Sequence, residues 1–332
     1  MDYGGKMDKF KKVIKKRAAI FFIILLAFVY VNNSSLFTKQ RTGKPTILAH
    51  RGLAQTFSME GITNETNTAQ RIHKPEHPFL ENTIPSMEAA FKYGADIVEL
   101  DIQPTKDGKF AVFHDWTLGY RTDGKGLIKD YTMDELRLLD VGYNYTSDGG
   151  RTFPFRGKGT GLMPSLDDVL TEFPEGSFLI HIKTDKTEDG QQLVQYLSKL
   201  PKENLNKLSV YGGDKPIALL QKELPNLRVM SKETLKKSLL SYIAIGWTGY
   251  IPEACKNTEL HIPLKYAPIL WGWGSRFLNR MDSVNTRVIV VGGSGEFSEG
   301  FDTAEDLKNL PLNYTGGIWT NRVDKIAPLF YK

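Results

Sequence analysis

The sequence has very little cysteine, because Cys255 is the only one among its 332 residues. One thiol cannot form an internal disulfide framework, and it cannot supply a zinc site built from several cysteines. The composition is not that of a disordered chain either, since 41% of the residues are hydrophobic and 24% are charged. These values are typical of a globular protein with a buried core. The length suits one large domain or two small ones.

The main part of the chain has no excess of charge of either sign. The formal net charge of +5 comes from residues 1–17, where seven basic residues stand against two acidic ones. The remaining residues balance to zero. A protein that binds nucleic acid needs a basic face on its folded domain. The charge balance gives no indication of such a face, so we expect no nucleic-acid partner.

One long apolar run follows this basic tail. Residues 18–31 are apolar, and the uncharged stretch continues to Phe37. A spanning helix needs about 20 mainly apolar residues and a signal-peptide core about 7–15. The run therefore predicts a signal anchor over 18–37, with a cleaved signal peptide and a buried core helix as alternatives. Basic residues stay on the cytoplasmic side, so we expect a membrane-anchored protein with an extracytoplasmic domain, or a secreted or periplasmic one after cleavage.

After a linker over 38–44, residues 45–332 show the pattern of one α/β domain. Short apolar runs predict strands: TILAH (46–50), DIVELDI (96–102), FAVFH (110–114), SFLIHIK (177–183), KLSVYG (207–212), LRVMS (227–231), TRVIVVG (286–292) and GGIWT (316–320). Amphipathic stretches between them predict helices over 84–93, 166–172, 191–199, 217–224 and 304–310. Repeated β-then-α units imply a parallel sheet, and about eight of them favour a TIM (β/α)₈ barrel. The competing doubly wound dinucleotide-binding sheet lacks its usual GxGxxG after the first strand.

Two stretches are too long for a minimal barrel. Residues 53–80 are polar, and residues 116–164 are rich in glycine, aspartate and threonine. Both are expected to be insertions in loops that follow strands. In a barrel these loops lie over the C-terminal ends of the strands, where active sites are found.

Ionisable residues gather at four predicted strand ends: His50-Arg51, Glu99-x-Asp101, His114-Asp115 and His181-x-Lys183. Residues two apart on a strand share one face, so the two carboxylates would repel unless a cation lies between them. Mg²⁺ and Ca²⁺ suit oxygen ligands, and the alternative is a salt-bridged pair. The first and third groups each offer a histidine for acid–base work, although a single histidine is often structural.

The motifs LAHRG (48–52), ENT (81–83), VELDIQPTKDG (98–108) and VFHD (112–115), in this order, resemble the glycerophosphodiester phosphodiesterase family. The resemblance continues through RTDGKG (121–126), DYTMDELRLLD (130–140) and PSLDDVL (164–170) and, more weakly, GGIWTNR (316–322), so it covers residues 46–332. It implies a TIM barrel that hydrolyses glycerophosphodiesters to glycerol 3-phosphate and an alcohol. It also implies one divalent metal ion, with Mg²⁺ or Ca²⁺ the expected choice.

The resemblance assigns roles to individual residues. The acid–base pair would be His50 and His114. The phosphate would contact two cationic side chains, and a carboxylate would lie near the metal and the substrate; these three residues are Arg51, Lys183 and Glu81. The metal would bind Glu99 and Asp101.

Two positions depart from the family pattern. His181 stands where the family usually has a third carboxylate ligand, and an imidazole favours softer divalent ions than Mg²⁺. Either His181 ligates a different metal, or the affinity is lower, or another group such as Asp185 contributes. Asn321 stands where the family usually has aspartate.

Two other hypotheses stay open. The first is a lysophospholipase D that acts on lysolipids at a membrane, with Trp271, Trp273 and Phe277 as an apolar rim for the acyl chain. Ordinary barrel packing is the alternative role for those aromatic residues. The second is a catalytically weakened barrel that acts as a binding protein, which the departures at His181 and Asn321 keep open.

Overall fold

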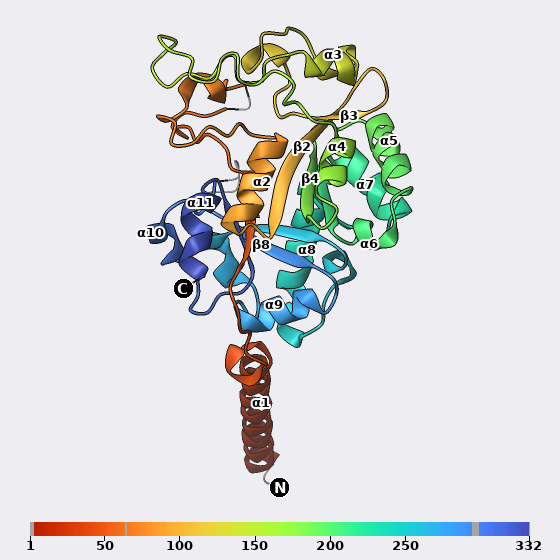
Figure 1. Cartoon of the computed structure of the whole chain (residues 1–332). Helices are drawn as coiled ribbons and strands as arrows, with labels where there is room; N and C mark the ends of the chain where they lie inside the picture. Colours follow the sequence, from red (N-terminus) through yellow and green to blue (C-terminus); the bar gives the residue numbers. More distant parts are fainter. Residues whose placement is uncertain (1–2, 64, 294–298, 332) are drawn as a thin grey trace.

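The computed structural model describes residues 3–63, 65–293 and 299–331 (Figure 1). Eight parallel strands run side by side in the order β6-β5-β4-β2-β1-β9-β8-β7. A parallel bridge between Val229 and Thr258 joins the two ends of this order and closes the sheet. The predicted TIM barrel is thus confirmed. Its strands are β1 (Thr46–Ala49), β2 (Ile97–Pro104), β4 (Phe178–Ile182), β5 (Leu208–Gly212), β6 (Arg228–Ser231), β7 (Glu259–Pro263), β8 (Arg287–Val291) and β9 (Gly317–Thr320).

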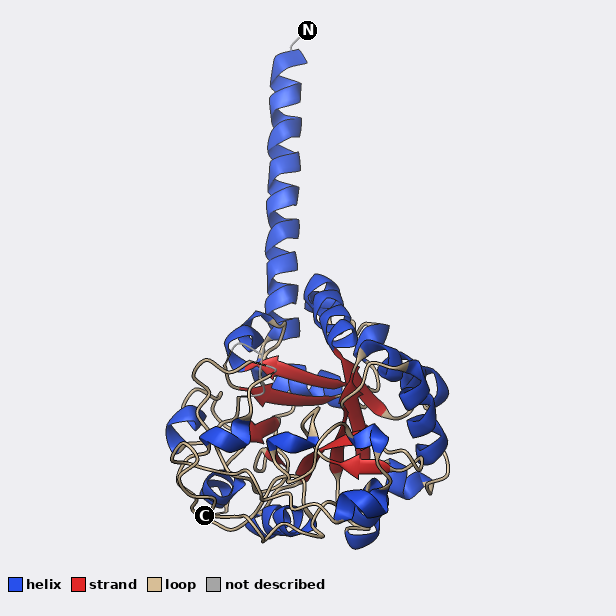
Figure 2. Ribbon diagram, turned by 90° about the horizontal axis from the view of Figure 1, so that it is seen from above, coloured by secondary structure: helices blue, strands red, loops and turns tan. Residues whose placement is uncertain are grey.

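Helices surround this barrel (Figure 2). The prediction over 84–93 matches α2, whose start is fixed by a capping box between Thr83 and Ser86. Its end is fixed by Gly94, which adopts the left-handed conformation. The described helices of the barrel and its insertions are α2 (Ile84–Tyr93), α3 (Met133–Arg137), α4 (Leu166–Glu172), α5 (Thr187–Leu197), α6 (Lys202–Leu205), α7 (Asp214–Glu223), α8 (Lys232–Ile245), α9 (Ser275–Asp282), α10 (Ala304–Leu307) and α11 (Val323–Ile326).

Two strand assignments differ from the sequence prediction. The run FAVFH contains β3 (Phe110–Val112), but β3 pairs antiparallel with β2 and lies outside the eight-strand order. The eighth barrel strand is β7, which the apolar pattern did not reveal. Two of its five residues, Glu259 and His261, are ionisable and nevertheless buried. A strand whose buried face carries charge cannot be found from hydrophobic alternation.

The barrel has apolar packing on both sides of its wall. The larger cluster lies between the strands and the outer helices. A smaller cluster is made by buried side chains at alternating strand positions and includes the fully buried Trp319. Its other members are Leu48, Ile97, Leu179, Ile289 and Val291. These side chains fill the barrel, so its interior is a core and not a pore.

The two insertions build a third apolar cluster of their own at the top of Figure 1. Leu80 from the first insertion packs with Leu118, Ile128 and Tyr145 from the second. Phe113, which follows β3, joins the same cluster. The insertions are therefore a packed layer beyond β3 and not loose loops.

The N-terminal helix α1 (Tyr3–Asn33) projects away from the barrel (Figure 2). Its last turn is held by α9, because Arg280 donates to the carbonyl oxygen of Asn32 at 2.9 Å and Arg276 donates to that of Val31 at 3.2 Å. In the described part of the chain, no helix is both long enough and apolar enough to cross a membrane. The signal anchor over 18–37 stays a prediction.

A tight turn follows β1 and determines where the first ionisable group lies. Arg51 and Gly52 both adopt left-handed backbone conformations, with φ angles of 58° and 80°. A Cβ atom on Gly52 would lie 2.6 Å from the Oγ atom of Ser86 and 2.8 Å from its carbonyl carbon. Glycine is thus required both by its φ angle and by the close approach of the α2 backbone.

We predict that Gly52→Ala lowers the free energy of unfolding by about 2–4 kcal/mol, because left-handed strain adds to overpacking. The matched control is Gly108→Ala, since Gly108 also has a positive φ of 75° but no atom within 4 Å of an added Cβ. Its loss should be limited to the strain of about 1–2 kcal/mol. Urea denaturation of both variants measures the difference. Equal losses would show that the contact with Ser86 is easily relieved.

Candidate active site

The ionisable residues predicted from the sequence meet at one cavity of about 580 Å³. It lies over the C-terminal ends of the central barrel strands, as expected for this fold. Its inner wall includes His50, Arg51, Glu81, Asp101, His114, Asp115, His181, Lys183, Tyr211, Asp302 and Asn321. Its outer wall comes from the insertions and includes Phe57, Met59, Ile62, Trp116 and Tyr120.

Three residues form a compact group that could hold a metal ion. One ligand atom from each of Glu99, Asp101 and His181 lies within 4.8 Å of the other two. The pairing of β2 with β4 sets Asp101 beside His181, and the Nδ1 atom of His181 lies 2.8 Å from Oδ1 of Asp101. Tyr211 from β5 supports the group: its hydroxyl donates to Oε1 of Glu99 at 2.6 Å, and its ring stacks on His181 at 4.2 Å.

The electrostatics of this group fit a divalent cation. Burial and the negative charge of Asp101 raise the pKa of Glu99 well above its ordinary value. Burial opposes ionisation of Asp101 too, but the positive charges of neighbouring side chains hold its pKa well below the ordinary value. Burial lowers the pKa of His181 to about 4, so its imidazole is neutral and able to ligate. Two carboxylates and one neutral imidazole are a chemically reasonable donor set for a divalent ion.

Buried ion pairs connect this group to the insertions. Arg51 lies 3.0 Å from Glu81 and 3.3 Å from Asp101. Arg121, which is 2% exposed, lies 3.2 Å from Glu81 and 2.6 Å from Asp115. Positive and negative groups therefore alternate from β2 to the second insertion. Sequence reasoning placed Arg121 only within the RTDGKG motif and gave it no role, because its partners lie far away in the chain.

The two histidines use the same ring atom for a partner within the protein. Nδ1 of His114 lies 2.8 Å from a carboxylate oxygen of Asp115. Nδ1 of His50 lies 2.7 Å from the amide oxygen of Asn321. In both rings Nε2 is left for a substrate, and Nε2 of His50 is 3.9 Å from Glu99. Burial, followed by the charge of Arg51, lowers the pKa of each histidine.

Other predicted residues take different places. The amine of Lys183 is 3.9 Å from Asp101 and 5.5 Å from the ring centre of Trp116, so it lies at the cavity. Trp271 does not line this cavity; its Nε1 donates to the carbonyl oxygen of Ile243 in α8. The expected substrate contact of Trp271 is thus not found, because the residue packs between outer helices. Asp185 instead accepts the backbone N–H of Lys215 and is not part of the three-residue group.

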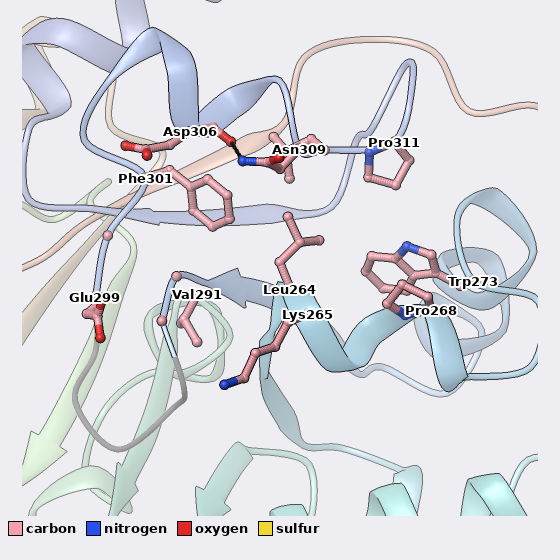
Figure 3. A pocket seen from close by; sticks show the side chains of 14 residues that line it. Leu264, Lys265, Pro268, Trp273, Val291, Glu299, Phe301, Asp306, Asn309 and Pro311 are labelled. Carbon is pink, nitrogen blue, oxygen red and sulfur yellow. Dashed lines mark hydrogen bonds between the residues drawn. The ribbon is translucent and has the colours of Figure 1, made fainter.

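A second cavity of about 630 Å³ lies beside the ends of β7 and β8 (Figure 3). Figure 3 shows Leu264 between Phe301 on one side and Trp273 on the other. Trp273, which the sequence suggested as part of an apolar rim, therefore lines this cavity and not the one with the histidines. None of the predicted acid–base or metal-binding residues is among its lining residues.

Comparison with known proteins identifies the family. Residues 50–248 match the model of the glycerophosphoryl diester phosphodiesterase family. The chain belongs to this family. The match covers more than half of the chain and includes both histidines, the three candidate metal ligands and both arginines of the ion-pair network. The resemblance inferred from the motifs is confirmed.

Individual relatives match over different lengths. A glycerophosphodiester phosphodiesterase of Bacillus altitudinis is 39% identical over 116 residues, which are 35% of this chain and 43% of that protein. The chain thus matches less than half the length of this relative. Lysophospholipase D GDPD3 of Mus musculus is 25% identical over 283 residues, which are 82% of this chain and 77% of that protein. The glycerophosphoryl diester phosphodiesterase domain of Rv2277c from Mycobacterium tuberculosis shares the fold, with a TM-score of 0.59, 17% identity and coverage of 84% of this chain and 97% of that one.

We predict that Arg121→Met lowers the free energy of unfolding by about 3–5 kcal/mol, because it removes the cation shared by the buried carboxylates of Asp115 and Glu81 and leaves them with Arg51 and His114 alone. The control is Arg137→Met, which removes surface pairs with Asp134 and Asp168. That change should cost less than about 1 kcal/mol. Thermal unfolding followed by circular dichroism compares the two. A loss for Arg121→Met no larger than that of the control would mean that water reaches the network.

Proposed function

We propose that this protein is a metal-dependent phosphodiesterase that hydrolyses glycerophosphodiesters to glycerol 3-phosphate and an alcohol. The observation that carries the proposal is the arrangement of His50 and His114. Both line one cavity with Nδ1 engaged by a partner within the protein, which leaves Nε2 for a substrate, and the same cavity borders the Glu99–Asp101–His181 group. Membership of the glycerophosphoryl diester phosphodiesterase family supports this reading.

A divalent ion would be held by Glu99, Asp101 and His181. When bound, such an ion supplies Lewis-acid polarisation of a phosphoryl oxygen and offsets negative charge that develops in the transition state. The charges of the buried centre also favour a bound cation. Its four carboxyl groups stand against three cationic side chains, and a bound cation would favour ionisation of Glu99 and offset the negative charge that an anionic substrate meets. These residues are Glu81, Glu99, Asp101, Asp115, Arg51, Arg121 and Lys183.

The cationic side chains differ in how firmly they are held. Arg51 is fixed between Glu81 and Asp101, so it provides a positive charge at one place. The amine of Lys183 is 3.9 Å from Asp101, beyond hydrogen-bond reach, and faces the cavity. Lys183 is therefore the side chain that is available to donate to a phosphate oxygen.

The hydrogen-bond partners of His50 and His114 indicate which histidine acts as the general base and which as the general acid. The carboxylate of Asp115 offsets part of the lowering of the pKa of His114 by burial and Arg51, which suits His114 to carry a proton to the leaving alkoxide. His50 is backed by the neutral amide of Asn321 and keeps a lone pair on Nε2. It would accept the proton of the attacking hydroxyl, either water or the 2-hydroxyl of the glycerol. A new P–O bond forms to that oxygen as the bond to the alcohol breaks. Attack by water gives glycerol 3-phosphate directly, whereas attack by the 2-hydroxyl gives a cyclic glycerol phosphate that water then opens to glycerol 3-phosphate.

A second candidate function is lysophospholipase D activity. Two observations favour it: the apolar side chains of the outer wall, among them Phe57, Ile62 and Trp116, and the match of the mouse lysophospholipase D over most of both chains. The helix α1 does not contribute to this choice, because it docks on α9 and on the turn after α8, whereas the cavity lies over the strand ends. Both activities would use the same histidines.

The two functions are separated by a substrate panel. Wild-type protein is treated with a chelator, supplied again with single metals, and assayed on glycerophosphocholine and on lysophosphatidylcholine. We expect hydrolysis of glycerophosphocholine only with metal. Faster turnover of the lysolipid would favour the second function. No turnover of either substrate with any metal, together with binding of glycerol 3-phosphate, would show a catalytically weakened binding protein.

We predict that His50→Ala and His114→Ala each lower turnover by about 10²–10⁴-fold, the usual effect of losing a general acid or base. Binding of a non-hydrolysable diester analogue should change far less. The control is His73→Ala, because His73 lies in the first insertion, contacts Thr56 and is absent from the cavity wall. Near-wild-type turnover in either cavity variant would make that histidine structural.

We predict that His181→Glu shifts the metal preference toward Mg²⁺ or Ca²⁺, since a charged oxygen ligand suits hard ions better than an imidazole does. The wild type should respond relatively better to Mn²⁺, Co²⁺ or Zn²⁺. Titration of both proteins with each metal, followed by calorimetry and by hydrolysis, measures the shift. Identical metal profiles would place His181 outside the ligand set and leave the ion to Glu99 and Asp101.

A further inference from the structure

A carboxylate lies behind the partner of His50. The amide oxygen of Asn321 is 2.7 Å from Nδ1 of His50, and its amide nitrogen donates to Oδ2 of Asp302 at 2.9 Å. The backbone N–H of Asn321 donates to the other carboxylate oxygen at 2.7 Å. Asn321 follows β9, and Asp302 lies in the segment before α10. The three side chains therefore form a hydrogen-bonded line from Nδ1 of His50 to the half-buried carboxylate of Asp302, which also borders the cavity.

These hydrogen bonds fix the orientation of the Asn321 side-chain amide. A carboxylate only accepts hydrogen bonds, so the nitrogen end of the amide must face Asp302. The oxygen end then faces His50 and can only accept. His50 is thereby required to carry its proton on Nδ1 and its lone pair on Nε2. A reversed amide would set two oxygens against each other and would favour the opposite tautomer.

The surroundings hold Asp302 in this place. The hydroxyl of Thr320 donates to the carboxylate at 3.1 Å, in addition to the two donors of Asn321. Three donors favour the ionised form and oppose burial, which raises the pKa of Asp302. The backbone packs closely here, because a Cβ atom on Gly300 would lie 2.7 Å from the amide nitrogen of Asn321. There is little room for the amide to reorient.

We propose that Asp302 is a positioning residue that acts through Asn321 to set the tautomer of His50, so that Nε2 is ready to accept a proton. The inference rests on the proposed function for its catalytic meaning, but the tautomer itself does not. His114 is served differently, since Asp115 contacts it directly. The tautomer of His114 is thus set by the carboxylate of Asp115, which contacts it directly. The tautomer of His50 is set by the carboxylate of Asp302 through the amide of Asn321.

The first test is Asp302→Asn in the full-length chain, which removes the charge and keeps the shape. Long-range ¹H–¹⁵N spectra of ¹⁵N-histidine-labelled protein report the tautomer, with His50 assigned by the loss of its signals in His50→Gln. We expect the Nδ1–H form in the wild type and a mixture or the Nε2–H form in the variant. Turnover should fall by about 10–100-fold, the scale of loss seen when the hydrogen-bond partner behind a metal-ligating histidine is removed. KM should stay within about twofold, because the substrate contacts remain.

The control is Asp324→Asn, which removes the same charge close to the same strand. Asp324 pairs with Arg322 and has no hydrogen bond to Asn321. Its tautomer spectrum and turnover should match the wild type. An unchanged tautomer and unchanged turnover in Asp302→Asn would overturn the proposal.

The decisive variant is the exchange Asp302→Asn with Asn321→Asp, which puts the carboxylate directly at Nδ1 of His50. We expect it to restore the Nδ1–H tautomer and to recover most of the turnover lost in Asp302→Asn. If neither the tautomer nor the turnover recovers, the proposal is overturned. This double variant decides alone if Asp302→Asn fails to fold. If the wild type turns over no diester while its tautomer still depends on Asp302, the proposed function fails and the positioning role stands.

Discussion

The active-site region depends above all on how Arg51 is held. Its guanidinium lies between Glu81 and Asp101, and its backbone N–H donates to Glu99 at 3.1 Å. One residue thus contacts three buried acids from two segments of the chain. Those contacts also hold a non-glycine residue in the left-handed conformation, which costs about 1–2 kcal/mol. The network continues through Arg121, so the barrel and its insertions share one set of charges.

Much of the site could be predicted from the sequence because barrel geometry brings strand ends together. Residues two apart on a strand share a face, so Glu99 with Asp101 and His181 with Lys183 were expected to face one centre. Parallel pairing of β2 with β4 then brings the two groups side by side. His50 joins them at the end of the neighbouring β1. Local periodicity and topology were sufficient for these residues.

The remaining features depend on contacts between distant segments. Asp302 is connected to His50 only through Asn321 at the end of β9, and nothing near Asp302 in the sequence indicates this connection. The strand β7 was missed because its buried residues include Glu259, which pairs with Arg287 on the next strand at 3.1 Å. Trp271 looked suited to a substrate, but the outer helices use it for packing. Pairwise compensation of this kind is invisible until the fold is known.

The way the barrel closes has a consequence for its dynamics. Seven neighbouring strand pairs share continuous ladders, whereas β6 and β7 meet through the isolated bridge of Val229 and Thr258 within the described residues. The ring therefore has a seam, and thermal breathing should concentrate where the fewest hydrogen bonds must break. In the strand order, β1 and β2 lie farthest from β6 and β7. The wall can thus loosen on one side while the opposite side keeps its charged groups in register.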